Sequence, residues 1–419
     1  MIRKLSFPGI FLLVACSSLF SVNAQSPIAE ISVHAGDILR TNTPASFNLK
    51  DELIKENQSF ILKYKAGGSE KEIYCQLEKG SPNRLWWIIS DTLHPGKSRK
   101  YTLFAIPKNS SNLVKSIKNK KEVIISVQNK DVLQYNYTSV YPPKGIDTIY
   151  KRSGFIHPLW SPSGNVLTRI QPPDHYHHYG IWNPWTKTKF EDKEIDFWNL
   201  NKGEGTVEHK AFSSLTSGDV FGGFRAELDH IDMKAKEGTR VALNEEWDVK
   251  VWGIKGIWLW DFYSTLECAS ESPFLIEEYR YAGFGYRALE EWTKNNSYVI
   301  TSEGKTRKDA DGSRGRWCNV YGELGTGQGG IVFMSYPENQ SHPEPLRIWP
   351  ENANGNRGDM FFNFCPTKES DWELKPGKSY TLKYRMLVYN GNISPEEAER
   401  YWQNFAHPPT IEIKHLKNQ

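Results

Sequence analysis

The stretch "EVIISVQNKDVLQYNY" (residues 122–137) shows the pattern that decides the fold class. Apolar and polar side chains alternate on both sides of Asn129-Lys130, which is typical of two strands joined by a tight turn. A turn followed by an alternating run also occurs at Pro95-Gly96 and again at Pro376-Gly377. These two turn-to-strand units predict two β-sandwich bodies, each closing with a similar hairpin.

Only one segment has a clear helical signature. Ser394-Pro395-Glu396-Glu397 is a capping box with proline at the first helical position and glutamate three residues after the cap. The helix should run to about Phe405, before His407-Pro408-Pro409 ends it. A chain with many predicted strands and one C-terminal helix is all-β in class.

The proline pair in Tyr141-Pro142-Pro143 is predicted to mark a domain boundary, because it follows the end of a β region. We therefore expect a smaller N-terminal β-sandwich over residues 27–143 and a larger β-sandwich over residues 144–415. The chain of 419 residues is long enough for this division. Nearly all residues that could carry chemistry fall in the larger part.

The first 24 residues predict an export signal. A basic pair precedes an apolar run, and Val22-Asn23-Ala24 offers small residues for cleavage. Leu13-Val14-Ala15-Cys16 resembles a lipobox, so a lipoprotein attached through Cys16 is the alternative, although the short apolar run favours plain export. No later stretch reaches the roughly 18 apolar residues that span a bilayer. We expect a periplasmic or secreted protein without a membrane span.

Charge and cysteine content exclude some classes. A net charge of +3 from 52 basic and 49 acidic residues gives no field suited to nucleic acid. The aromatic content of 13% suits a β core and also suits sugar rings, which lie against indoles. The four cysteines that follow the predicted export signal have no C-x-x-C spacing, which argues against a zinc site made of thiolates. Whether they form disulfides is left open by the sequence. They are Cys75, Cys268, Cys318 and Cys365.

Histidines are concentrated in "PPDHYHHYGIWNPW" (residues 172–185). If this segment is extended, His175 and His177 share one face, while Asp174 and His178 share the other. A polar strand end with backbone-bonded histidines is one interpretation. Three histidines within four positions, followed by tryptophans, favour a functional site.

Two kinds of chemistry are open for this cluster. One imidazole of His175, His177 and His178 could act as acid–base on a sugar, with Asp196 or Glu208 as the partner carboxylate. Alternatively, two of the histidines could bind a divalent metal with a third ligand from elsewhere in the chain. The residues predicted to bind the ligand or complete the site are His157, Trp182, Trp198, His209, Arg316, Trp317 and His342. His157 and His209 are the candidates for the third metal ligand.

Several quoted segments together resemble a bacterial family. "RSGFIHPLWSPSG", "PPDHYHHYGIW", "DFWN" and "GTVEH" are similar to a family long labelled "methane oxygenase PmoA" and now treated as a domain of unknown function. The resemblance runs over roughly residues 30–392, and "DHYHHYGIW" is its most specific part. Family members typically have arginine or histidine where this chain has Tyr179, so Tyr179 is given no role.

The resemblance also implies an architecture. The family is similar to galactose-mutarotase-like supersandwich proteins, in which histidines and a carboxylate on a concave sheet act on sugars. We therefore predict an exported carbohydrate-active enzyme, a hydrolase or lyase acting on a glycan fragment. The ligand is a carbohydrate, and no cofactor is expected, with a divalent metal as the alternative. A non-catalytic carbohydrate-binding protein is the rival prediction.

Overall fold

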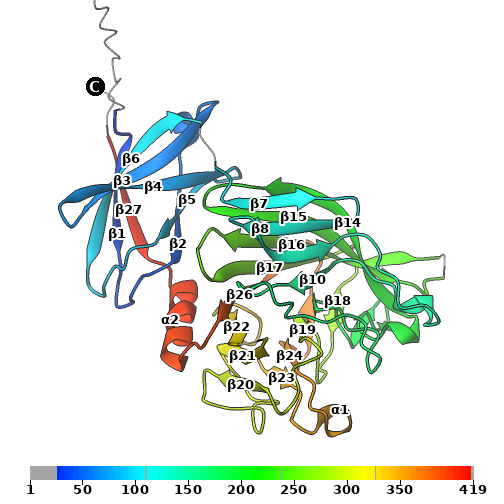
Figure 1. Cartoon of the computed structure of the whole chain (residues 1–419). Helices are drawn as coiled ribbons and strands as arrows, with labels where there is room; N and C mark the ends of the chain where they lie inside the picture. The colour runs from blue at the N-terminus through cyan, green and yellow to red at the C-terminus, as the bar shows by residue number, and fades with distance from the viewer. Residues whose placement is uncertain (1–25, 109–110, 237, 326, 417–419) are drawn as a thin grey trace, which may run out of the picture.

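The computed structural model describes residues 26–108, 111–236, 238–325 and 327–416. The predicted export signal and Cys16 lie outside these residues. The described chain folds almost entirely into β-strands, arranged in four sheets (Figure 1). The all-β prediction is therefore confirmed.

The first sheet is built from both ends of the described chain. Its strand order is β2 (Thr43–Asn48), β5 (Arg84–Ile89), β4 (Ser69–Glu78), β3 (Gln58–Ala66), β6 (Ser98–Pro107), β1 (Ala29–His34) and β27 (Thr410–His415). Buried and exposed positions alternate along β1 and β5, as the sequence pattern requires. Leu62, Trp87 and Leu103 are fully buried in a separate core beneath this sheet.

The three remaining sheets form the larger part of the molecule. One has the order β23 (Leu346–Ile348), β24 (Phe361–Phe364), β19 (Gly285–Arg287), β11 (Ile181–Trp182), β10 (Phe155–Leu159), β9 (Lys130–Asn136), β8 (Glu122–Val127) and β7 (Val114–Lys118). A small sheet has the order β13 (Lys193–Ile195), β12 (Thr188–Phe190), β18 (Phe274–Ile276) and β25 (Trp372–Leu374). The last has the order β14 (Gly205–Thr216), β15 (Phe221–Asp232), β16 (Arg240–Trp252), β17 (Trp258–Cys268), β26 (Ser379–Asn390), β22 (Gly327–Ser335), β21 (Trp317–Leu324) and β20 (Ser297–Thr301).

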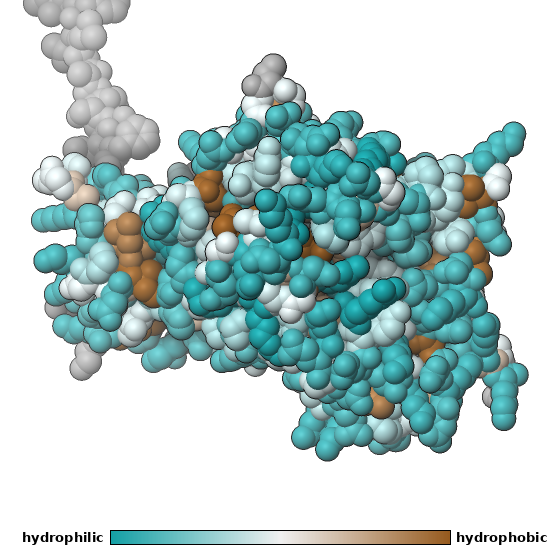
Figure 2. Space-filling view, turned by 90° about the horizontal axis from the view of Figure 1, so that it is seen from below, coloured by the Kyte–Doolittle hydropathy of each residue, from teal (hydrophilic) through white to brown (hydrophobic). Residues whose placement is uncertain are grey.

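The two eight-stranded sheets face each other across one shared apolar core. Phe333 of β22 stacks on Phe362 of β24, with ring centres 4.6 Å apart. Tyr135 of β9 stacks in the same way on Phe224 of β15, at 4.4 Å. This arrangement leaves the loops at the edges of the sheets free to form a site. The outer face shown in Figure 2 is mainly hydrophilic, with apolar residues in small separate patches.

The boundary between the two parts of the molecule does not lie at Tyr141-Pro142-Pro143. Strands β7, β8 and β9, which precede the prolines, belong to the sheet that carries β10 and β11. The change of sheet falls between the end of β6 at Pro107 and the start of β7 at Val114. The predicted boundary at residue 143 is therefore corrected. The last strand, β27, also leaves the larger part and pairs with β1.

The helix predicted near the C-terminus is present as α2 (Pro395–Ala406), and the side chain of Ser394 accepts a hydrogen bond from the Glu397 backbone N–H. It lies between the first sheet and β20 to β22 (Figure 1). Asn404 accepts a hydrogen bond from Thr43, while Trp402 donates one to the Ser335 carbonyl. The helix thus joins the two parts of the molecule.

The other helical pieces are short: α1 (Ala353–Asn356) and the 3-10 turns η1 (Asp51–Leu53), η2 (Thr148–Tyr150) and η3 (Leu200–Lys202). No helix in the described residues is long and apolar enough to cross a bilayer.

The two similar turns do not close hairpins. Gly96 and Gly377 have φ of 70° and 71°, so each turn needs the left-handed conformation that glycine allows. The strand after the first turn, β6, pairs with β1 and β3, and β26 pairs with β17 and β22. The sequence pattern predicted the turns correctly, but the strand after each turn pairs with strands other than the one before that turn.

Candidate functional site

Two consecutive turns place the histidines. The His175 N–H bonds to the Pro172 carbonyl at 2.9 Å, and the His178 N–H bonds to the His175 carbonyl at 3.0 Å. The segment is therefore not extended before β11, and the predicted separation of His178 from His175 and His177 is wrong. The turns bring all three rings together, with ring centres 4.6 to 5.4 Å apart.

The three imidazoles line one side of a cavity of about 350 Å³. His178 forms its inner part, with 3% of its surface exposed, and His175 and His177 are half-buried. The other lining residues are Trp198, Asn199, Arg280, Tyr281, Arg347, Trp349, Pro350, Ala353, Asn354 and Phe361. A small cavity with apolar walls and a few convergent polar groups is typical of ligand sites.

Asp174 holds His175 in place. The Asp174 carboxylate is 2.8 Å from Nδ1 of His175 and accepts hydrogen bonds from Arg287 at 2.9 Å and from Asn354 at 2.7 Å. Burial raises the pKa of Asp174, but the bond to His175 and the charge of Arg287 together lower it well below the ordinary value. The carboxylate is thus ionised and fixes the orientation of the His175 ring.

The two other imidazoles are kept neutral. Burial lowers the pKa of His177 to about 4, and the nearby charge of His175 acts in the same direction. Burial also lowers the pKa of His178 well below its ordinary value. At neutral pH both rings therefore carry a free nitrogen lone pair.

Aromatic side chains surround the cluster, although not all of those predicted. Trp349 lies 4.9 Å from the His175 ring and Phe361 stacks on His178 at 5.2 Å. Trp182 is fully buried behind His178, so its predicted contact with a sugar is corrected. Trp198 lines the cavity but is only 1% exposed.

Asp196 and Glu208 do not line the cavity. The Asp196 carboxylate accepts hydrogen bonds from the backbone N–H groups of Trp198 and Asn199. It also forms an ion pair with Lys202, at 2.8 Å. It therefore shapes the loop that carries Trp198. Glu208 is half-buried on β14. The carboxylate that the structure brings to the histidines is Asp174.

His157 and His209 do not join the cluster. The Nδ1 atom of His157 lies 2.9 Å from the Thr168 hydroxyl, and the His157 side chain lines a different hollow. His209 lies 3.1 Å from the Tyr135 hydroxyl and packs on Phe212. The third imidazole beside His175 and His177 is His178, which the expectation of an extended segment had placed on the opposite face.

Arg316, Trp317 and His342 gather at α2, away from the cavity lining. Arg316 and Trp317 both donate hydrogen bonds to Glu399 of α2. Arg316 also lies over the ring of Trp402, and His342 stacks on the same ring. Their side chains hold the helix against β21 and β22.

The residues that sequence reasoning left out of the site come from distant segments of the chain. Arg287 on β19 and Asn354 on α1 bind Asp174, and Tyr281 and Trp349 line the cavity. Trp349 lies between prolines and glycines in the sequence, and this irregular segment is a signal that could have pointed to it. Arg287 had none, because its neighbours in sequence read as an ordinary strand.

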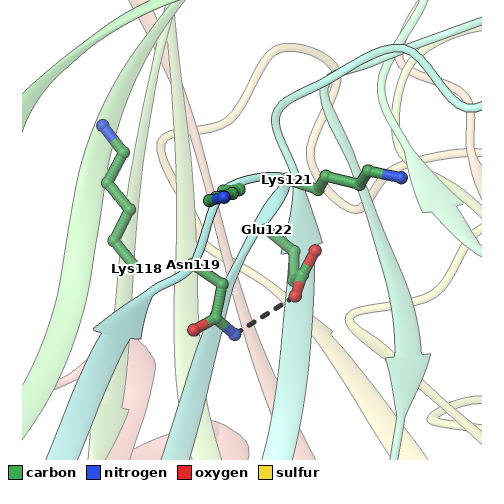
Figure 3. A pocket seen from close by; sticks show the side chains of 5 residues that line it. Lys118, Asn119, Lys121 and Glu122 are labelled. Atoms are coloured by element: carbon green, nitrogen blue, oxygen red, sulfur yellow. Dashed lines mark hydrogen bonds between the residues drawn. The ribbon is translucent and has the colours of Figure 1, made fainter.

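A larger hollow lies on the β7–β8 turn, lined by residues 118–122. Figure 3 shows Lys118 and Lys121 pointing in opposite directions, while Asn119 donates a hydrogen bond to Glu122 at 3.1 Å. The side chains do not converge on a common point. This hollow therefore lacks the arrangement of a ligand site.

The sequence comparison identifies the family. A family of unknown function, DUF6807, matches residues 122–403, and this range contains the whole cavity. The chain belongs to this family. No curated protein matches the chain. The matched range runs from the start of β8 into α2, so it includes the larger part of the molecule except β7.

Three solved structures illustrate the distant likenesses. A galactose mutarotase related enzyme from Lactobacillus acidophilus is 8% identical with a TM-score of 0.31, covering 67% of this chain and 100% of that one. An alpha-mannosidase from Enterococcus faecalis is 9% identical with a TM-score of 0.39, covering 93% and 46%. A GH36 alpha-galactosidase from Geobacillus stearothermophilus is 8% identical with a TM-score of 0.32, covering 67% and 41%. The chain thus spans less than half of the last two, and the function has to be argued from the site.

Three histidines outside the cluster should destabilise the folded state at acid pH. Burial lowers the pKa of His157, His209 and His342 to about 4 in the fold, below the ordinary value of 6.5. Between pH 6.5 and 4 the unfolded chain therefore takes up protons that the folded chain does not. We expect the free energy of unfolding to decrease as pH falls through this window, measured by urea denaturation.

The variant His157→Asn should lose less stability between pH 6.5 and 4 than the wild type, because its amide titrates at no pH. The matched control is His94→Asn, which alters an exposed histidine of the first sheet's loops. Equal pH slopes for the wild type and His157→Asn would show that His157 does not contribute.

Proposed function

We propose that this chain is an exported carbohydrate-active enzyme, a hydrolase or lyase, which acts on a glycan fragment in the histidine cavity. The observation that carries the proposal is a cluster of three imidazoles in one cavity. One of them, His175, is oriented by the Asp174 carboxylate and lies beside the ring of Trp349. Proton transfer to a glycosidic oxygen or from a ring carbon needs a positioned acid–base side chain, and neutral imidazoles can accept such a proton. Trp349 and Tyr281 offer aromatic surface for the apolar face of a sugar.

Two guanidinium groups support a polar, hydroxyl-rich ligand. Arg280 lies over the rings of Tyr279 and Tyr281 and forms no ion pair with the described carboxylates. Arg347 is paired with Asp311 at the cavity edge. Both can donate to sugar hydroxyls or a sugar carboxylate, while Asn199 and Asn354 add amide groups. Proton transfer would occur at the histidine cluster in the same cavity.

The direct test is a screen of the chain without residues 1–24 against plant, host and microbial oligosaccharides. We expect at least one sugar to raise the melting temperature and to give a new product on chromatography. Stabilisation without any product would instead establish a carbohydrate-binding protein. A full panel that neither stabilises the protein nor is converted would refute the proposal.

Two variants check that the sugar binds in this cavity. Trp349→Ala should weaken the affinity about 3- to 10-fold, since stacking is worth roughly 1 kcal/mol. Tyr298→Ala removes an aromatic ring that is 42% exposed on β20, outside the cavity lining, and should leave the affinity unchanged. Equal losses in both variants would place the ligand elsewhere.

A further inference from the structure

The three imidazoles of the cavity are close enough to share one ion. One possible ligand nitrogen from each of His175, His177 and His178 lies within 4.8 Å of the others. With metal–nitrogen bonds of about 2.05 Å, the ring centres of two imidazoles on one ion lie roughly 4.5–5.3 Å apart for bond angles between 90° and 110°. The observed separations of 4.6 and 4.9 Å lie in this range, and the third, 5.4 Å between His175 and His177, lies just above it.

The surroundings of His175 are those of a metal-bound histidine. A ligating imidazole usually donates its other N–H to a carboxylate, which fixes the ring and makes the ligand nitrogen more basic. Asp174 occupies this position at Nδ1, so Nε2 is the nitrogen left for an ion. Arg287 of β19 and Asn354 of α1 hold the carboxylate in place. A surface histidine would not need three residues to orient it.

His178 gives an independent observation. Its ring is 3% exposed, and its Nδ1 is buried without a hydrogen-bond partner in the described part of the chain. Buried polar atoms in proteins are nearly always partnered, so a nitrogen without one calls for an explanation. The ring lines the cavity. A bound ion at the cluster is a partner that protein atoms do not supply.

The donor set indicates the class of ion. Three imidazoles, with no thiolate or carboxylate among the cavity-lining residues, suit a borderline divalent transition ion. Three protein ligands with an open fourth position are typical of catalytic zinc sites.

We propose that His175, His177 and His178 bind one Zn²⁺-class ion, with Asp174 orienting His175 behind it. The site itself stands on geometry alone. Its part in turnover rests on the proposed function, where water on the ion would take the place of imidazole as the acid–base group. Cu²⁺ or Ni²⁺ would bind the same donors, and zinc is the ion to test first.

The test uses untagged chain without residues 1–24, freed of metal by EDTA and dialysed. Zinc chloride alone is titrated by calorimetry, and Co²⁺ is used for absorption spectra. We expect about one ion per chain. His177→Ala should weaken binding and abolish the visible bands of four-coordinate Co²⁺. Asp174→Asn, which keeps the shape of the side chain, should weaken binding about 10- to 100-fold.

His94→Ala is the matched control, and its affinity should equal that of the wild type. Binding of less than about a tenth of an equivalent at 10 µM free zinc would overturn the site. An unchanged affinity in His177→Ala would also overturn it, provided circular dichroism shows a folded variant. Zinc binding without conversion of any sugar keeps the site and rejects the proposed function. Full sugar turnover in EDTA-treated chain supports the proposed function and removes the ion from it.

Discussion

His177→Ala should lower kcat/KM on a confirmed carbohydrate substrate by about 10²- to 10⁴-fold, the usual contribution of a positioned proton-transfer group. The imidazole is half-buried, lines the cavity and contacts both neighbouring histidine rings. Its ring has no hydrogen-bond partner among the described residues, so its removal breaks none of the bonds that hold the fold. The urea midpoint should therefore stay close to that of the wild type.

The measurement compares initial rates and urea unfolding for His177→Ala and for His94→Ala, which removes an imidazole from the molecular surface. A large loss of rate with unchanged stability, confined to His177→Ala, is the expected pattern. Retention of at least half of the wild-type rate in His177→Ala would reject proton transfer at the cluster. A parallel loss of rate and stability would assign His177 a structural role.

The fold was largely predictable because local pattern and final structure agree. The alternating segment at residues 122–137 forms β8 and β9, and the capping box at Ser394 begins α2. Alternation depends on a strand with one buried face, as β1 and β5 have. The domain boundary failed for a related reason. Proline pairs mark a loop, but which sheet a strand joins is decided by its partners far along the chain.

The site was predictable in place but not in arrangement. Three histidines in four positions predicted where the site lies. The segment was predicted to be extended, but it forms two turns that bring the three rings together. The partner carboxylate was predicted at Asp196 or Glu208, whereas the carboxylate that contacts the histidines is that of Asp174. It is fixed by Arg287 and Asn354, which lie 113 and 180 residues away. Contacts of that range leave no local signal in a single sequence.

A second large effect is expected at Glu245, a fully buried residue of β16. Its carboxylate accepts hydrogen bonds from Asn183 and Ser264, each at 2.6 Å, and lies 2.9 Å from Nε2 of the buried His230. Trp247 donates a fourth bond at 2.6 Å. Glu245→Ala would leave Nε2 of His230 and Nε1 of Trp247 buried without this partner and would leave Asn183 and Ser264 bonded only to each other, so the free energy of unfolding should fall by about 3–5 kcal/mol.

Urea denaturation of Glu245→Ala and Glu246→Ala separates the buried network from the strand itself. Glu246 lies next in sequence on the same strand, is half-buried and bonds only Ser213 in the described structure, so its loss should cost less than about 1 kcal/mol. Glu245→Gln keeps the volume and should fall between the two. Asn183 directly follows Trp182, whose ring lies 5.0 Å from His178, so the network also supports the inner part of the cavity. Equal losses in both alanine variants would mean that the carboxylate does not hold this network together.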